Sequence, residues 1–227
     1  MAMLGRAALA MWWDMAPEQR AEFEHWHTHE HYPERLGIPG FRRASRWRDA
    51  GAGEGIFQLY ELESHDVLSS AAYLARLNAP TPWSARMMPH HRNMVRSQCN
   101  VLASHGGVTA RHALALRFSP ADGKGESLLQ GLAPLLADLS GRAGLGGAHL
   151  LRHSPPPIAM TAEQKLRGGD KFADWVLIVT GYELEALDAL ARAELGAPAL
   201  EALGAAPGSQ HGRYQLSYAA TPVDVAA

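Results

Sequence analysis

The residues with the clearest capacity for chemistry are three polar side chains in one predicted helix: His27, Glu30 and His31. Turned at about 100° per residue, they fall within one arc of roughly 140° together with Phe23 and Trp26. A stripe of this kind should face the core. Helices seldom place imidazole and carboxylate groups there unless a partner or a ligand meets them. The pattern therefore indicates a site on this helix, without naming a substrate.

This histidine and glutamate cluster suits general acid–base chemistry, because histidine titrates near neutrality and a neighbouring carboxylate can fix its tautomer. We predict that His27 or His31 acts as the base and that Glu30 orients it. The alternative is a buried, hydrogen-bonded cluster that ties the helix to the sheet. His25 and His29 fall on the opposite side of the helix and are predicted to face solvent.

Metal binding by the same cluster is less favoured. His27 and His31, four residues apart, could ligate a metal with Glu30 as a further group. The H-E-x-x-H signature is absent, however, because His31 follows Glu30 at once, and no other ligand cluster is evident. No distinct axial-ligand sequence for a haem is present either. We predict no metal and no cofactor, and keep a metal- or haem-dependent oxygenase as a lesser alternative.

Two residues on predicted neighbouring strands could act on a bound substrate. Arg46 could anchor a carboxylate or an enolate, and Tyr60 could donate a hydrogen bond to a carbonyl. The alternatives are an ion pair of Arg46 with Glu30 or Glu61, and a core position for Tyr60. The predicted substrate-binding residues are aromatic or polar and lie near these elements or in a proline-rich loop: Trp26, Trp47, Tyr73, Asn78, Thr81 and Trp83.

Composition limits the function classes. Of 227 residues, 47% are hydrophobic and 19% are charged, which indicates a soluble globular chain. The net charge of -2 and the lack of a basic run argue against a nucleic-acid partner. Cys99 is alone, so no internal disulfide can form, and a cytoplasmic location is expected. The apolar run Ala7 to Trp13 is too short to span a membrane and predicts a strand.

The elements that must position the site follow the same order twice. The first half is predicted as strand, helix, strand, strand, helix, strand, with an irregular excursion before its last strand: Ala7–Asp14, Pro17–Leu36, Phe41–Arg48, Ile56–Glu63, Ser64–Asn78, Ala79–Arg96 and Gln98–Ser104. Met87, Met88, His90 and His91 lie in this excursion and are predicted to be a flexible surface. The second half repeats the order with His112–Ser119, Glu126–Gly144, Ala148–His153, Trp175–Tyr182, Leu184–Leu195 and Arg213–Ala220.

Each half is thus a β-α-β-β-α-β unit with the ferredoxin-like arrangement. A four-stranded antiparallel sheet covered by helices on one face must bury its other face elsewhere. Two such sheets in one chain can cover each other. We therefore predict an α+β fold made of two tandem ferredoxin-like repeats, residues 1–106 and 107–227, packed as a fused α+β barrel. Only the first repeat carries the polar cluster; the helix in 126–144 presents a leucine stripe and makes the second repeat mainly structural.

Several motifs in the first hundred residues resemble the EthD-like members of the dimeric α+β barrel superfamily. They are the W-H-x-x-E-H sequence of Trp26 to His31, the P-G-F turn at Pro39 to Phe41, and the Tyr60-Glu61 pair. The segment Tyr73 to Trp83 is similar to the tandem subgroup. The resemblance implies the fold, a pocket in or beside the barrel, and little about the reaction, because the superfamily includes cofactor-free oxygenases, isomerases, lyases and haem enzymes.

Two function classes follow. The first is a cofactor-independent enzyme, an isomerase, lyase or monooxygenase, that moves a proton on a small hydrophobic substrate with a carbonyl group or an aromatic ring. The second is a barrel that binds a small molecule without catalysis. The expected partners are a small-molecule ligand and a second copy of the chain in a homodimer, because folds of this kind often expose an additional apolar helix face.

Overall fold

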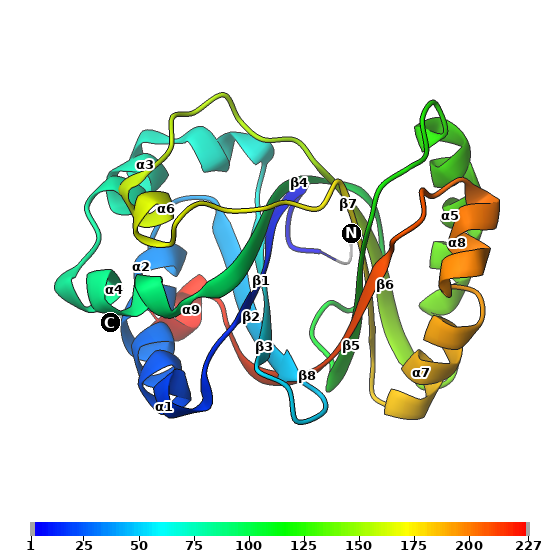
Figure 1. The fold of residues 1–227 in the computed structure, drawn as a ribbon, viewed down its shortest axis with the longest axis horizontal. Helices are drawn as coiled ribbons and strands as arrows, with labels where there is room; N and C mark the ends of the chain where they lie inside the picture. The colour runs from blue at the N-terminus through cyan, green and yellow to red at the C-terminus, as the bar shows by residue number, and fades with distance from the viewer. Residues whose placement is uncertain (1–2, 226–227) are drawn as a thin grey trace.

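The fold is that of a computed structural model, and the structure describes residues 3–225. Its strands form a closed antiparallel barrel in the order β1-β3-β2-β8-β5-β7-β6-β4. Helices lie on two opposite sides of this barrel (Figure 1). The predicted α+β fold with two sheets closed into one barrel is therefore confirmed.

The first half contributes four strands and the helical segments between them. In chain order these are β1 (Ala7–Asp14), α1 (Pro17–Trp26), η1 (His27–His31), α2 (Tyr32–Leu36), β2 (Phe41–Asp49), β3 (Gly55–Leu62), η2 (His65–Ser69), α3 (Ala71–Asn78), α4 (Pro82–Met87), η3 (Met88–His90) and β4 (Arg92–Gly106).

The second half follows after a short connection. Its elements are β5 (His112–Phe118), α5 (Gly125–Leu139), β6 (Leu145–His153), α6 (Ala162–Leu166), β7 (Trp175–Gly181), α7 (Leu184–Arg192), α8 (Ala197–Leu203), β8 (Gln210–Ala220) and α9 (Pro222–Val225).

Strand pairing inside each half has the ferredoxin-like order, β4-β1-β3-β2 and then β8-β5-β7-β6. The two sheets join where β2 pairs with β8 and where β4 pairs with β6. Both junctions are antiparallel, so no strand of the barrel has a free edge. The length of β4 allows it to pair with β1 through its first part and with β6 through its second part.

The two faces of the sheet are buried differently. The barrel interior is filled by apolar side chains, among them Trp12, Trp47 and Phe57, which stack on one another. The outer face of the first-half sheet packs instead against α2 and α3 through residues such as Leu9 and Tyr60, and against α1 through Trp13 and Ile56. A site beside the histidine helix therefore lies outside the barrel, between sheet and helices.

The predicted helix Pro17–Leu36 is interrupted at its centre. Pro33 lacks a backbone N–H and cannot donate to the carbonyl four residues earlier. The chain accommodates it with a π-turn, η1, in which the N–H of Tyr32 donates to the carbonyl of His27, five residues back. A π-turn advances each residue by less than the 100° of an α-helix, so residues four apart align more closely and Glu30 leaves the stripe.

Helices are present in one segment that was predicted to be irregular and in another for which no element was predicted. The excursion Ala79–Arg96 holds α4 and η3, and β4 begins at Arg92, earlier than predicted. The connection between β6 and β7 contains α6, started by a capping box at Thr161 and Gln164. Although α6 belongs to the second half, it contacts α3 and η3 and lies among the helices of the first half (Figure 1).

Among residues 3–225, no helix has both the length and the apolar character needed to cross a bilayer.

Candidate functional site

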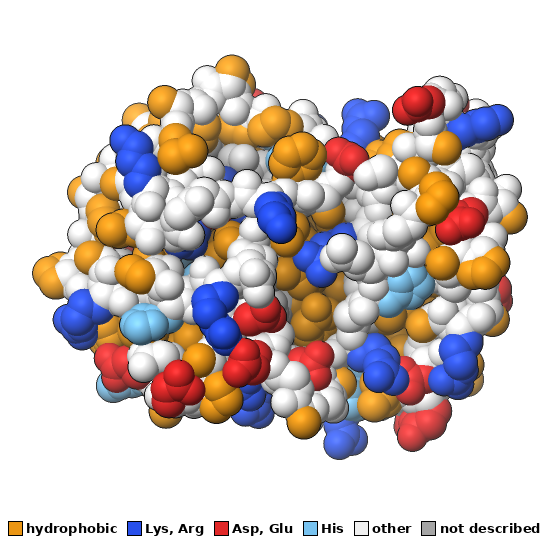
Figure 2. All heavy atoms as spheres, in the orientation of Figure 1, with side chains coloured by type: hydrophobic (Ala, Val, Ile, Leu, Met, Phe, Trp, Pro, Cys, Tyr) orange, Lys and Arg blue, Asp and Glu red, His pale blue; other side chains and the backbone are white. Residues whose placement is uncertain are grey.

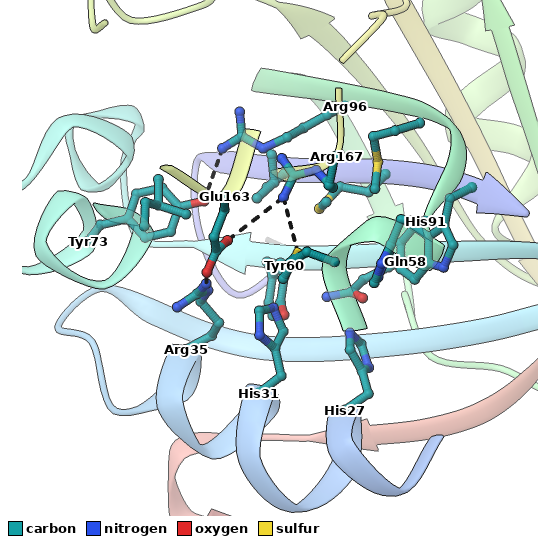
Figure 3. A pocket seen from close by; sticks show the side chains of 16 residues that line it. His27, His31, Arg35, Gln58, Tyr60, Tyr73, His91, Arg96, Glu163 and Arg167 are labelled. Carbon is teal, nitrogen blue, oxygen red and sulfur yellow. Dashed lines mark hydrogen bonds and ion pairs between the residues drawn. The ribbon is translucent and has the colours of Figure 1, made fainter. Parts of the chain in front are cut away.

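A small buried cavity lies between the outer face of the first-half sheet and the helices that cover it. About 20 Å³ of it is open to the centre of a water-sized sphere, which is room for about one water molecule. Its polar lining consists of His27, His31, Arg35, Gln58, Tyr60, Tyr73, His91, Arg96, Glu163 and Arg167 (Figure 3). The predicted histidine helix therefore does face an enclosed polar space.

His27 is held by an arginine on β2. Nη1 of Arg46 lies 3.1 Å from Nδ1 of His27. A guanidinium group can only donate, so Nδ1 accepts, and the neutral ring carries its proton on Nε2. Arg46 also donates to Ser217 and Thr28, at 3.1 and 3.3 Å. These bonds fix the orientation of the His27 ring.

His91 is held in the opposite tautomer. Its Nδ1 lies 3.1 Å from the carbonyl oxygen of Met87, which can only accept. The neutral ring therefore keeps a free lone pair on Nε2. The ring packs against Trp13 at a centroid distance of 4.9 Å. This residue was predicted to lie on a flexible surface and is instead 6% exposed, because η3 turns it inward.

His31 completes the group. Its ring stacks on that of His27 at 5.2 Å and against Trp26 at 4.6 Å. Its Nδ1 is buried and has no hydrogen-bond partner within residues 3–225.

All three histidines are driven toward the neutral form. Burial is the main cause that lowers the pKa of His27 and His31 well below the ordinary value; Arg46 adds to it at His27, and Arg35 at His31. Burial also lowers the pKa of His91 to about 3. At neutral pH the cavity therefore presents uncharged imidazole rings.

The charges of the cavity come from arginines and one carboxylate. Arg35 on α2 forms a buried ion pair with Glu163 on α6 (Figure 3). Arg167 lies 3.8 Å from Glu163 and 2.9 Å from Asp170. The second half of the chain thus supplies the carboxylate of this cavity, together with one guanidinium group.

Tyr60 faces the cavity from β3. Its hydroxyl group is buried and makes no hydrogen bond within the part of the chain that the structure describes. Burial raises its pKa above the ordinary value, so the hydroxyl keeps its proton. It is therefore available to donate to an oxygen atom placed in the cavity.

Glu30 lies elsewhere than predicted. Its Oε1 accepts hydrogen bonds from Trp26 Nε1 at 3.1 Å, Thr81 Oγ1 at 2.5 Å and Ser84 Oγ at 3.4 Å. It is absent from the cavity lining, and none of its hydrogen bonds joins it to His27 or His31. The widened turn directs it toward α4, where it ties two helices together.

The other predicted site residues divide into two groups. Tyr73 lines the cavity, and its hydroxyl accepts a hydrogen bond from Arg96 at 3.0 Å. The remaining residues have structural contacts: Trp47 lies inside the barrel, Asn78 accepts from the backbone of Ala162, Thr81 caps α4, and Trp83 donates to Glu22. Trp26 packs on His31 but does not line the cavity.

The strand residues Arg46 and Tyr60 are brought close, as the predicted hairpin requires. Arg46 is paired in register with Gln58, two residues before Tyr60. Glu61, considered above as a partner of Arg46, binds Arg43 instead at 2.5 and 2.9 Å. No carboxylate within residues 3–225 lies within 4 Å of a nitrogen of the Arg46 guanidinium.

Sequence reasoning missed six polar residues of the cavity lining: Arg35, Gln58, His91, Arg96, Glu163 and Arg167. The capping signature of Thr161 and Gln164 could have shown α6, but nothing in its sequence indicates that it packs on the other half. That contact depends on the path of the chain between β6 and β7.

The closed cavity does not fit a metal ion or a haem. No group of three or more His, Cys, Asp or Glu side chains in the described part of the chain is placed to hold a metal ion. The free space of the closed cavity is also far smaller than a porphyrin.

The comparisons with known proteins show a similarity of fold. No model of a protein family matches the sequence, and no curated protein matches it. The structure resembles that of an anthrone oxidase-like protein with a TM-score of 0.69 and 11% identity, over 100% of this chain and 98% of the other. A candidate monooxygenase from Fusobacterium nucleatum has a TM-score of 0.65 and 8% identity over 96% of each chain.

A third structure links this fold to the ferredoxin-like class. It is an uncharacterized ferredoxin-fold protein from Listeria monocytogenes, related to antibiotic biosynthesis monooxygenases, with a TM-score of 0.51 and 8% identity over 95% of this chain and 97% of the other. The chain is therefore similar in fold to ferredoxin-like α+β barrel proteins.

Proposed function

We propose that the chain is a cofactor-independent enzyme that removes a proton from a small hydrophobic substrate with a carbonyl group or an aromatic ring. The observation that carries this proposal is the convergence of three neutral histidines, the unpartnered hydroxyl of Tyr60 and buried guanidinium groups on one cavity. The likeness to an anthrone oxidase-like protein supports an aromatic ketone as the first substrate to test.

The tautomers assign different tasks to the histidines. His27 carries its proton on Nε2 and can donate a hydrogen bond to a substrate carbonyl. His91 and His31 each have a ring nitrogen without a hydrogen-bonded proton donor, so either can accept a proton. The sequence-based roles therefore change: His27 becomes the donor, and His91 joins His31 as a candidate base.

The arginines can stabilise the substrate anion that proton removal forms. When a proton moves from carbon to an imidazole, the substrate becomes an enolate or a phenolate. Arg35 and the hydroxyl of Tyr60 can stabilise this negative charge in a space with little water. The same cations keep the histidines neutral before the reaction.

An aromatic ketone requires more space than the closed cavity offers. The α6 helix forms one wall of the cavity, and the Arg35–Glu163 ion pair joins it to α2. Shortly after α6 the chain passes through Gly168 and Gly169, whose φ angles are 82° and 94°. Displacement of this segment would open the cavity. We include this movement in the proposal.

Solvent-deuterium exchange tests the proposal without knowledge of the product. Anthrone and simple aryl ketones are incubated in D₂O, and loss of the C–H signal next to the carbonyl is followed by NMR. His31→Gln, His91→Gln and Tyr60→Phe should each slow exchange, the base variant by about 100-fold or more. His29→Gln, on the exposed face, is the control. If no ketone exchanges faster with the protein than in buffer alone, the proposal is contradicted.

A non-catalytic small-molecule-binding protein is the second candidate. The observation that favours it is the structural role of Glu30, which ties helices together and does not orient a histidine. Binding of an aryl ketone with no exchange and no turnover would support this alternative.

Three further expectations are also proposals: EthD-like membership, cytoplasmic location and a homodimer. The barrel closes within one chain, so a dimer would have to form on another surface. Light scattering at micromolar concentration tests the dimer, and a mass equal to one chain contradicts it.

A further inference from the structure

A groove lies on the other side of α6 from the histidine cavity. Glu163 of α6 lines the cavity, whereas the next residue, Gln164, lines the groove. The groove has a volume of about 480 Å³ and runs along the outer face of β4 beside the strap formed by residues 170–174. The hollow in the middle of the face shown in Figure 2, with hydrophobic side chains at the bottom and Lys and Arg side chains at the rim, lies between the two sheets and is a different pocket from this groove.

Two hydrogen-bond donors face this groove from β4 without an acceptor that satisfies them. Arg96 is 6% exposed, and no carboxylate within residues 3–225 lies within 4 Å of it; its bond to the Tyr73 hydroxyl does not neutralise its charge. Gln98 is also 6% exposed, and its Nε2 has no partner in the described part of the chain. The two residues are two positions apart on one strand, so they point to the same side.

Such donors are costly unless an anion meets them. A buried charge without a partner carries a desolvation penalty, and a buried amide N–H without an acceptor adds to it. The acidic residues of the groove are already engaged: Asp170 with Arg167 and Gln164, and Asp174 with Ser119. Lys171 adds a further positive charge at the edge.

An exposed aromatic ring lies next to these donors. Phe172 is 60% exposed and stacks on His153 at a centroid distance of 4.6 Å and an interplanar angle of 21°. His153 therefore covers one face of the Phe172 ring. The remaining surface of Phe172 is apolar and exposed beside the groove. Such a surface favours a flat aromatic group.

We propose that this groove is a binding site for an aromatic carboxylate, whose carboxylate group is held by Arg96 and Gln98 while its ring packs against Phe172. Arg96 also lines the histidine cavity, so the two sites share this side chain, whereas Gln98 and Phe172 line the groove alone. The proposal requires no turnover in the cavity. The carboxylate would accept charge-assisted hydrogen bonds from the Arg96 guanidinium and an ordinary one from Gln98 Nε2.

Titration with three probes tests the chemical class. Benzoate carries both the ring and the charge, benzamide keeps the ring without the charge, and acetate keeps the charge without the ring. By calorimetry and by NMR shifts on the full chain, benzoate should bind at least about tenfold more tightly than benzamide, because the charge-assisted hydrogen bonds are lost. Equal affinity for benzoate and benzamide overturns the proposal.

Variants locate the site. Arg96→Gln should weaken benzoate binding by about tenfold or more, and Arg96→Lys should restore part of it. Gln98→Leu and Phe172→Ala should each weaken it by about threefold or more. Met160→Ala, an exposed apolar residue outside the groove lining, is the matched control for Phe172.

Two results would contradict this location. Unchanged benzoate affinity in both Gln98→Leu and Phe172→Ala would do so even if Arg96→Gln failed to fold. Benzoate shifts that map to other surface arginines would also exclude the groove. Because the assay measures binding alone, it can succeed or fail whatever the deuterium-exchange experiment shows.

Discussion

Arg46 donates a hydrogen bond to Nδ1 of His27 across 3.1 Å, and this contact decides what His27 can do. It places the ring proton on Nε2 and brings a positive charge next to a buried imidazole. A protonated His27 would lose this hydrogen bond and face the guanidinium charge. The residue is therefore suited to donate a hydrogen bond in its neutral form.

Replacing Arg46 should change the titration of His27. In Arg46→Gln the pKa of His27 should rise, because the nearby positive charge is removed, although burial continues to hold it below the ordinary value. NMR titration of the imidazole C–H signals measures this change. Arg48→Gln, on the same strand and with a side chain 47% exposed, is the control. A His27 pKa that is the same in Arg46→Gln and in the parent contradicts this interpretation.

The buried Arg35–Glu163 pair should contribute strongly to stability. Glu163→Gln leaves Arg35 with its weaker partner Glu34 and should lower the free energy of unfolding by about 3–5 kcal/mol. Glu63→Gln removes the partner of Arg42 in an exposed ion pair and should change it by less than about 1 kcal/mol. Urea denaturation of the two variants makes the comparison. Equal losses of the free energy of unfolding in the two variants would show that the buried pair is no more stabilising than the exposed one.

Glu30 should behave as a structural residue. Glu30→Gln weakens an acceptor of three hydrogen bonds and should lower the free energy of unfolding by about 1–3 kcal/mol. His25→Gln and His29→Gln, both on exposed positions, should melt like the parent. A parent-like melt of Glu30→Gln combined with a large loss of activity would instead return Glu30 to the catalytic group.

Stability should fall in mildly acidic solution. An unfolded histidine titrates near pH 6.5, whereas His91 in the folded chain has a pKa of about 3. Between these values only the unfolded state takes up the proton. The free energy of unfolding should therefore keep its full value above about pH 6.5. Below this pH it should fall by about 1.4 kcal/mol per pH unit for each such histidine.

Urea denaturation between pH 4.5 and 7.5 measures this slope. His91→Gln should reduce it by the share of one histidine, and the exposed His29→Gln should leave it unchanged. A slope that His91→Gln does not alter would show that His91 does not stay neutral in the folded chain.

The order of elements could be predicted from the sequence because it depends on local patterns. The Gly and Pro residues that follow α2, for example, mark a boundary that neighbours along the chain impose. The repeat of one β-α-β-β-α-β order in both halves then leaves two sheets with one uncovered face each, and a closed barrel follows.

The inward direction of His27 and His31 could also be predicted, because it follows from helical spacing. The direction of Glu30 could not, because the π-turn that precedes Pro33 changes that spacing within one turn. The sequence contained Pro33, but the choice between a kink, a break and a π-turn depends on what packs against the helix.

Tertiary structure alone decided which distant residues share the cavity with His27 and His31. Glu163 lies 132 positions after His31 in the chain and reaches the cavity only because α6 crosses to the helices of the first half. His91 faces inward because η3 packs beside Trp13. Local sequence determines which side chains a helix or strand presents, whereas contacts between distant segments determine what those side chains meet, because burial and charge depend on every element packed around them.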